Sequence, residues 1–155
     1  MPVKKIKNRI KARFRKGKKD IKKNIGDFFE WVKGAELIEL KECDFEKDPV
    51  RPELNNEFRT SFGRKIYGVK YMNEIHAVMC FAFTNEIPKN VKELDLLSQD
   101  AFLQSATRDQ NVGQIAIAYT VWSTKKGGGK LIVKEVFKMI KKSNHLNRLV
   151  TLSPL

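Results

Sequence analysis

The sequence predicts an α/β (α+β) fold: a mixed sheet with one crossover helix, preceded by a basic helical arm at the N-terminus. Strand-like segments and turn residues alternate through the middle of the chain, which predicts the sheet. Near the C-terminal end, an apolar run passes through three glycines into an amphipathic helix and then into a further strand-like segment. That order predicts a crossover connection between two parallel strands.

The positive charge of the chain is concentrated at its beginning. The whole sequence has a formal net charge of +13, and residues 1–24 hold twelve Lys or Arg residues against one acid. Apolar residues recur there at near-helical spacing, so we expect a basic amphipathic arm over residues 1–34 and a globular domain over residues 35–155. Three roles stay open for residues 1–24: binding nucleic acid or another polyanion, lying on an anionic membrane surface, or docking on protein.

Several classes of protein do not fit the composition. No apolar run approaches the ~20 residues of a membrane span, and no apolar segment follows the basic start as in a secretory signal. Cys43 and Cys80 are far apart and fit free thiols in a reducing cytoplasm. Two histidines and two cysteines at scattered positions predict no metal site.

The first half of the domain reads as one strand, a long loop and a hairpin. We expect a strand at residues 36–41, followed by a loop in which the many acids are solvated. Residues 65–72 and 75–84 predict two strands joined by a tight turn at Asn73-Glu74. Residues 85–111 are polar and predict a loop with a short helix around residues 91–103.

The second half contains the crossover. Residues 113–123 are almost continuously apolar, as in a central strand covered on both faces. A glycine-rich loop follows and leads into a helix, and residues 148–152 predict a last strand parallel to the central one. The expected inner face of the helix consists of Ile132, Val133, Val136, Phe137 and Ile140.

The glycine-rich loop is the strongest functional signal. Three successive glycines let the backbone approach an anion closely, and the helix N-terminus directs N–H groups and a positive dipole at it. Lys125, Lys126 and Lys130 add charge, so the pattern predicts a phosphate or pyrophosphate ligand. The spacing fits neither a Walker A loop nor a dinucleotide fingerprint. The plain alternative is an ordinary turn between strand and helix.

The loop also resembles a known one. Residues 124–129, Thr-Lys-Lys-Gly-Gly-Gly, are similar to the Gln/Arg-x-x-Gly-x-Gly/Ala loop of the GNAT-type N-acetyltransferase fold, with Thr124 where that loop has Gln or Arg. The resemblance implies an acetyltransferase-like sheet whose loop holds the pyrophosphate of coenzyme A. The residues expected to hold the coenzyme are Trp122, Ser123, Thr124, Lys125, Lys126, Gly127, Gly128, Gly129 and Lys130.

Four segments in the same order resemble the malonyl-CoA decarboxylases, whose catalytic domain has that fold. They are residues 83–91, 117–124, 131–136 and 149–155. The last, Leu-Val-Thr-Leu-Ser-Pro-Leu, is similar to the family's Phe-Val-Thr-Leu-Ser-Pro segment, which carries an active-site serine. The resemblance implies that malonyl-CoA is cleaved to acetyl-CoA and carbon dioxide, and that Ser153 is the catalytic serine that contacts the malonyl carboxylate.

The resemblance has a limit at the C-terminal end. The family's proton donor is a histidine in a Phe-His-x-x-Asn-Gly-Ala motif beyond the serine, and neither His76 nor His145 matches it. The strands that complete such a sheet are also missing from the sequence, so we expect a truncated fragment, a chain completed by a partner, or a protein without the chemistry. His76 and Cys80 make a poor catalytic pair, because four residues of strand separate them by about 13 Å.

Enzymatic activity is therefore left open by the sequence. The first hypothesis is a malonyl-CoA decarboxylase-like protein that binds acyl-CoA and needs no metal. The second is an N-acetyltransferase that uses acetyl-CoA, for which no base can be named. The third is a non-enzymatic protein that binds a polyanion or assembles through the basic arm.

Overall fold

The computed structural model of the chain describes residues 31, 33–108 and 113–152. The chain divides into two units, Met1–Ala35 and Glu36–Leu155. The arm predicted over residues 1–34 lies almost entirely outside the described residues and stays a prediction. The second unit contains, in chain order, β1 (Glu36–Leu40), η1 (Phe45–Lys47), α2 (Asn56–Thr60), β2 (Lys65–Tyr71), β3 (Glu74–Thr84), α3 (Val91–Arg108), β4 (Ile115–Ser123), α4 (Gly128–Lys142) and β5 (Arg148–Thr151).

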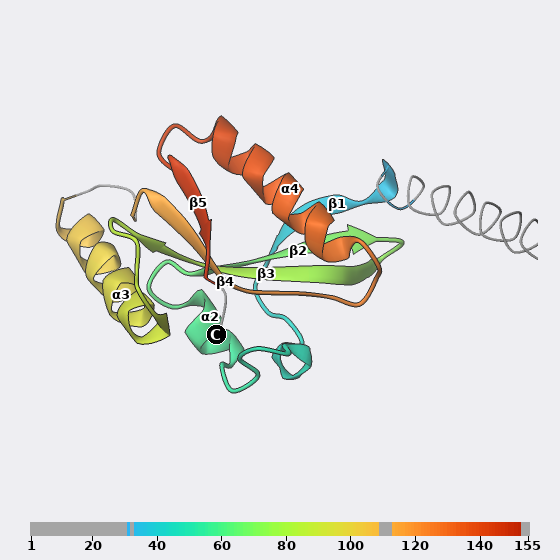
Figure 1. Cartoon of the computed structure of the whole chain (residues 1–155), viewed down its shortest axis with the longest axis horizontal. Helices are drawn as coiled ribbons and strands as arrows, with labels where there is room; N and C mark the ends of the chain where they lie inside the picture. The colour runs from blue at the N-terminus through green and yellow to red at the C-terminus, as the bar shows by residue number, and fades with distance from the viewer. Residues whose placement is uncertain (1–30, 32, 109–112, 153–155) are drawn as a thin grey trace, which may run out of the picture. The chain divides into compact units, whose positions relative to one another are not determined.

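The five strands form one mixed sheet in the order β1-β2-β3-β4-β5 (Figure 1). The first four strands pair antiparallel, and β5 pairs parallel to β4 after the α4 crossover. This arrangement confirms the predicted fold class of a mixed sheet with a crossover helix, including the parallel pairing of the last two strands. Within the described residues, no helix combines the length and the apolar character needed to span a membrane.

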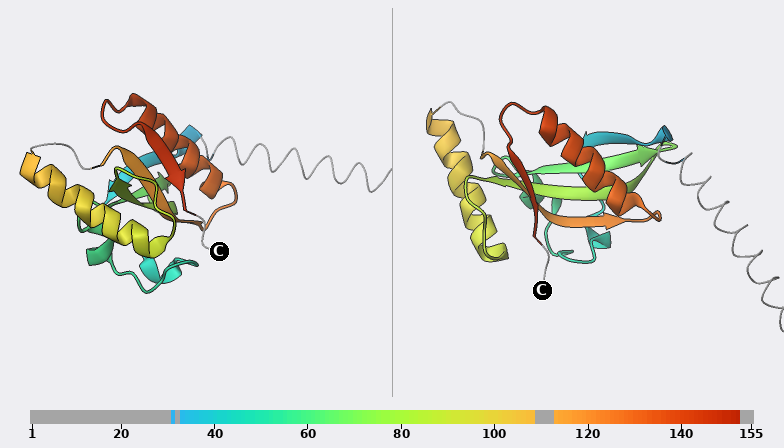
Figure 2. Two further views of the ribbon diagram at one scale, coloured as in Figure 1. Left: turned by 60° about the vertical axis from the view of Figure 1, so that its left-hand side comes forward. Right: turned by 45° about the horizontal axis from the view of Figure 1, so that its top comes forward.

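Helices cover both faces of the sheet (Figures 1 and 2). The crossover helix α4 lies on one face, and the segment between β1 and β2, together with α3, lies on the other. The core on the second face is made of side chains from all the central strands and from α3. Its buried members are Ile66, Val78, Cys80, Ala82, Leu94, Ile115, Ile117, Tyr119 and Trp122.

The inner face of α4 differs from the predicted one at three positions. Gly128, Ile132, Val136 and Ile140 are buried at four-residue intervals, and Leu131 is buried beside them. Val133 is only half-buried, and Phe137 is exposed, with the Lys141 ammonium 4.7 Å from its ring centroid. The face is set by where the helix begins, because a start at Gly128 turns the 128-132-136-140 row toward the sheet.

The hairpin turn lies one residue earlier than predicted. Tyr71 pairs with Glu74, so the two turn residues are Met72 and Asn73, not Asn73 and Glu74. Both have positive φ, 50° and 65°, as a type I′ turn requires. Asn73 tolerates this conformation well, and the twist of such a turn matches the twist of the paired strands.

Helical structure is more extensive than the sequence predicted. α3 runs over 18 residues, well beyond the short helix expected around residues 91–103. Among the α3 residues whose burial is described, 91–105, only a narrow stripe, Leu94, Ser98 and Ala101, is buried, while Leu96 and Leu103 are exposed. The expected loop after β1 contains η1 and α2, and the Asn55 side chain caps α2 by accepting a hydrogen bond from the Phe58 N–H.

Candidate functional site

The loop between β4 and α4 is a compact, internally bonded turn. The Thr124 N–H donates to the His76 carbonyl at 2.8 Å, which fastens the start of the loop to β3. The Ser123 hydroxyl accepts from the Lys125 N–H at 3.1 Å and lies 2.5 Å from the Lys125 carbonyl. The Gly128 N–H closes the turn onto the same carbonyl at 2.9 Å. The predicted glycine loop is therefore a defined structure, and it presents the N-terminus of α4.

The three glycines have different structural roles. Gly127 caps α4 in the left-handed conformation, with φ of 81°. Gly128 is buried, and a Cβ there would collide with the Ser123 hydroxyl and meet the Ala77 side chain. At Gly129, a Cβ would meet nothing within 4 Å. Gly127 and Gly128 thus shape the turn, and Gly129 borders open space in which a ligand can approach the backbone.

The N-terminus of α4 is electropositive and has free donors. Within the described part of the chain, the backbone N–H groups of Gly129 and Lys130 have no hydrogen-bond acceptor. The first turn of α4 contains no acid, and the side chains of Lys126 and Lys130 are exposed beside it. Free N–H groups, the helix dipole and two ammonium groups together favour an anion such as a phosphate.

The strand that leads into this loop has an open edge. β4 pairs with β5 only from Ile115 to Ala118, and the Leu152 N–H donates to the Ala118 carbonyl at 3.0 Å. A β-bulge at Tyr119 interrupts the pairing of β4 with β3 at the same level. From Tyr119 to Ser123, therefore, one edge of β4 has no partner strand among the described residues, and its backbone can bond an extended ligand.

Some of the predicted coenzyme residues are accessible at the N-terminus of α4, and the side chains of others contact other parts of the protein. Gly129, Lys130 and Lys126 surround the helix N-terminus, while the Lys125 ammonium lies 5.5 Å from the Tyr71 ring centroid. Trp122 is 8% exposed and packs in the core, with the Arg59 guanidinium 5.5 Å from its ring centroid. The predicted catalytic residue, Ser153, lies outside the described residues.

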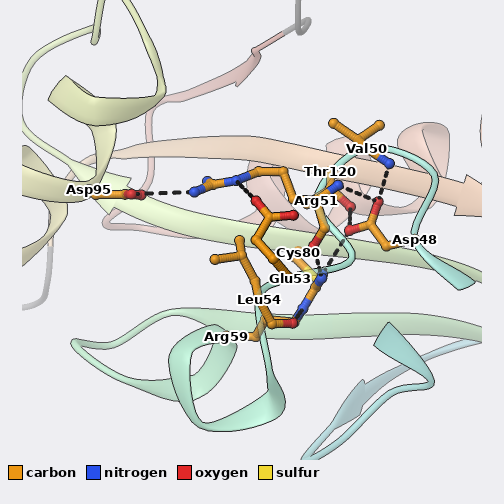
Figure 3. Close-up of polar contacts among 9 residues, drawn as sticks. All are labelled: Asp48, Val50, Arg51, Glu53, Leu54, Arg59, Cys80, Asp95 and Thr120. Atoms are coloured by element: carbon orange, nitrogen blue, oxygen red, sulfur yellow. Dashed lines mark hydrogen bonds and ion pairs between the residues drawn. The ribbon is translucent and has the colours of Figure 1, made fainter. Parts of the chain in front are cut away.

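A buried polar network was missed by the sequence reasoning (Figure 3). Asp48 was expected in a solvated acid-rich loop, but it is 2% exposed. Its carboxylate accepts from the Thr120 hydroxyl at 2.7 Å, the Arg59 guanidinium at 3.0 Å and the Val50 N–H at 2.8 Å. Burial alone would raise the pKa of Asp48, but these hydrogen bonds outweigh it and lower the pKa.

This network fixes the position of β4 next to its bulge. Thr120 directly follows the bulge residue Tyr119, and Asp48 joins it to the segment between β1 and β2. The Arg59 guanidinium also donates to the carbonyls of Leu54 and Arg51 at 2.8 Å. One local signal could have indicated this network. The Asp48 carboxylate accepts hydrogen bonds from the N–H groups two and three residues later, which is a turn that Asp favours.

Neither histidine forms a recognisable catalytic pair with a cysteine. His76 has its imidazole 3.7 Å from the Glu74 carboxylate, whereas the fully buried Cys80 thiol contacts Arg59 at 3.3 Å. His145 is half-buried after α4 and lines a hollow of about 480 Å³ with Tyr67 and Met139. Within the described residues, no group of three or more His, Cys, Asp or Glu side chains is arranged to hold a metal ion.

The fold is similar to that of part of a solved enzyme structure. The crystal structure of malonyl-CoA decarboxylase from Cupriavidus metallidurans matches over 83% of this chain, with a TM-score of 0.53 and 21% identity. The match covers 33% of that structure, so this chain spans about a third of its length. A possible acetyltransferase from Clostridium difficile 630 matches over 77% of this chain and 80% of that one, with a TM-score of 0.48 and 9% identity.

The match to the decarboxylase structure supports the fold and leaves the activity open. The likeness to the decarboxylase structure confirms the fold that the sequence resemblance implied. No model of a protein family matches the chain, and no curated protein matches it.

Proposed function

We propose that this chain binds an acyl-CoA thioester along β4 and at the N-terminus of α4. One observation supports this proposal: the open edge of β4 and the electropositive loop adjoin. The open edge begins at the Tyr119 bulge and leads directly into the loop. An extended pantetheine arm would bond to the β4 backbone, and the pyrophosphate would lie against the N–H groups of Gly129 and Lys130. Lys126 and Lys130 would supply the countercharge.

We further propose that the acyl group is malonyl and that the reaction is decarboxylation. This finer proposal is supported by the four sequence segments, including the one that carries Ser153, and by the fold shared with a malonyl-CoA decarboxylase. Loss of carbon dioxide leaves negative charge on the thioester oxygen as an enolate. Hydrogen-bond donors beside that oxygen would stabilise it, and a general acid would then protonate the carbon. Ser153 would hold the malonyl carboxylate before the bond breaks.

Two substitutions at Gly129 test the coenzyme site. Because a side chain fits there without collision, Gly129→Asp places a carboxylate where the pyrophosphate would lie and leaves the loop intact. An acid in the first helical turn also favours the helix, so loss of binding cannot be ascribed to unfolding. We expect Gly129→Asp to weaken CoA binding at least tenfold, about 1.4 kcal/mol, and Gly129→Ala to bind nearly as wild type.

The measurement is calorimetric titration of CoA at about 0.15 M salt, where long-range attraction by the basic arm is screened. Both variants keep that arm, so the difference between them reports on the loop. Equal affinity of Gly129→Asp and Gly129→Ala would place CoA elsewhere on the chain. Absence of CoA binding to the wild-type chain at about millimolar ligand would reject the acyl-CoA proposal as a whole.

The decarboxylation proposal has its own readout. We expect the full chain to release labelled carbon dioxide from carboxyl-labelled malonyl-CoA. Ser153→Ala should abolish that release while CoA affinity stays unchanged, since the serine would contact only the malonyl carboxylate. Tight CoA binding without release of labelled carbon dioxide would leave the binding proposal standing and reject the decarboxylase.

A further inference from the structure

Two cysteines that are far apart in the sequence meet on the face of the sheet opposite α4. Cys43 follows β1 in a stretch without regular secondary structure, and Cys80 lies in the middle of β3. Cys43 packs against the core cluster that contains Cys80, and each thiol is close enough to influence the pKa of the other. The Cys43 thiol donates a hydrogen bond to the side-chain oxygen of Asn56 at 3.5 Å. They are the only cysteines of the chain.

The two thiols differ in access. Cys80 is 0% exposed, and its sulfur accepts a hydrogen bond from the Arg59 guanidinium at 3.3 Å (Figure 3). Cys43 is half-buried and lines a hollow of about 430 Å³ together with Asn56, His76 and Trp122. A small molecule can therefore reach Cys43 from the hollow, while Cys80 does not line the hollow and is not exposed to solvent.

The pKa of Cys43 lies below that of a free thiol. The neighbouring Cys80 thiol lowers it most, burial opposes this shift, the Arg59 charge adds to the lowering, and the Asp48 and Asp44 charges act against it. The neighbouring Cys43 thiol and burial raise the pKa of Cys80, so Cys80 remains the protonated partner. The side chains of Glu42, Asp44 and Lys47 also face the hollow. An accessible thiolate beside a buried thiol is the arrangement of an attacking and a resolving cysteine.

We propose that Cys43 is a site of thiol–disulfide exchange with a low-molecular-weight disulfide, and that Cys80 resolves the adduct into an intrachain Cys43–Cys80 disulfide. In the first step the Cys43 thiolate attacks one sulfur of the reagent, whose disulfide bond breaks and releases one thiolate. In the second step Cys80 gives its proton to that thiolate and attacks the Cys43 sulfur, which expels the second thiolate. The second thiolate takes up from water the proton that Cys43 lost when it ionised. Two protein thiols are oxidised, and one reagent disulfide is reduced to two thiols.

The disulfide requires the two sulfur atoms to approach to about 2 Å, so one of the two segments must move. Cys43 lies in a stretch without regular secondary structure, whereas Cys80 is held in the middle of β3. The bond would tie the segment between β1 and β2 to the centre of the sheet, next to Arg59 and Asp48. Because it constrains the unfolded chain, oxidation should raise the urea concentration at which the chain unfolds.

The test uses the full chain and oxidised glutathione, with intact-mass and peptide mass spectrometry. We expect wild type to lose two hydrogens and both free thiols without retaining glutathione, and dithiothreitol to reverse this. Cys80→Ser should stop at the first step, with one glutathione on Cys43. Cys43→Ser should stay unmodified, because its remaining thiol is buried; the same variant in urea should react.

The control needs no variant. Brief alkylation of the wild-type chain should modify Cys43 and spare Cys80 in the same molecule. Retention of both free thiols in glutathione, a stable glutathione adduct on wild type, chains linked to one another through Cys43, or equal alkylation of both cysteines would each overturn the proposal. CoA affinity is measured separately on the reduced chain, so this outcome does not depend on the proposed function.

Discussion

At the scale of single residues, the decisive contact is the one between Asp48 and Arg59. Both side chains are fully buried, so both have lost their hydration, and neither charge can be tolerated there alone. The carboxylate is satisfied by four donors, and the guanidinium has carbonyl acceptors in addition to Asp48. Since one of the four donors is Thr120 on β4, the network stabilises the strand on which the proposed ligand lies.

Replacing Asp48 by alanine should therefore be strongly destabilising. The substitution leaves the Arg59 charge buried without its partner, which typically costs about 3–5 kcal/mol. The matched control is Asp44→Ala, four residues away, which removes an exposed ion pair with Lys47 and should cost less than about 1 kcal/mol. Urea unfolding followed by circular dichroism measures both. Similar losses in the two variants would show that the buried pair contributes no more than a surface pair.

The position of Asp48 illustrates what a sequence cannot indicate. Its hydrogen-bond partner Thr120 lies 72 residues further along the chain, and no local pattern connects the two. Acid-rich segments are usually solvated, so the charge pattern favoured the wrong environment for this one residue. The packing of Cys43 against the core cluster that contains Cys80 was missed for the same reason, because no local pattern connects those two positions.

At the scale of elements, the turn from β4 into α4 combines a packed side and an open side. Gly128 faces Ser123 and Ala77, and Gly129, one residue later, faces open space. The helix rotates by about 100° between neighbouring residues, which separates the two environments completely. The turn can therefore be rigid where it contacts the sheet and accessible where it would contact a ligand.

Alanine at these two neighbouring positions should have opposite effects on stability. Gly128→Ala inserts a methyl group against Ser123 and should cost about 1–3 kcal/mol by overpacking. Gly129→Ala replaces a flexible helical residue without collision and should gain up to about 1 kcal/mol. Thermal and urea unfolding of both variants give the comparison. Equal effects at the two positions would mean that the Ser123–Gly128 contact does not hold the turn.

The elements that the sequence predicted best are those with strong periodicity or strong turn residues. The two central hairpin strands, the apolar β4 and the helix after the glycines all lie where the pattern placed them, within one to three residues. The length of α3 was underestimated because its apolar residues do not follow its buried face. Leu96 and Leu103 are exposed, and Ser98 is buried. The β-bulge at Tyr119, on which the open edge of β4 depends, has no sequence signal of its own.

At the scale of the whole molecule, the charge is divided along the chain. Residues 1–24 contain twelve of the 31 Lys and Arg residues and only one of the 18 acids, so the remainder is close to neutral. The lysines at the α4 N-terminus act on a ligand within a few ångströms. The charge of residues 1–24 is large enough to bind a polyanion without sequence preference. The proposed CoA binding and the predicted polyanion binding should therefore be separable.

Deleting residues 1–24 should strongly weaken nucleic-acid binding and leave CoA binding unchanged. The full chain is expected to bind a single-stranded DNA oligonucleotide with an affinity that falls steeply with salt, because each neutralised phosphate releases a counterion. The near-neutral remainder should bind at least tenfold more weakly and with a flatter salt dependence. Fluorescence anisotropy across a potassium chloride series measures both, and calorimetry on the same samples measures CoA affinity.

A second variant separates charge from length. With the lysines of residues 1–24 replaced by glutamine, the chain keeps its full length and loses most of the excess charge. It should behave like the deletion, because the attraction is electrostatic and does not depend on a folded contact. Binding of the full chain that is insensitive to salt, or that survives both variants, would contradict this role. Binding to anionic vesicles but not to DNA would assign residues 1–24 to a membrane surface instead.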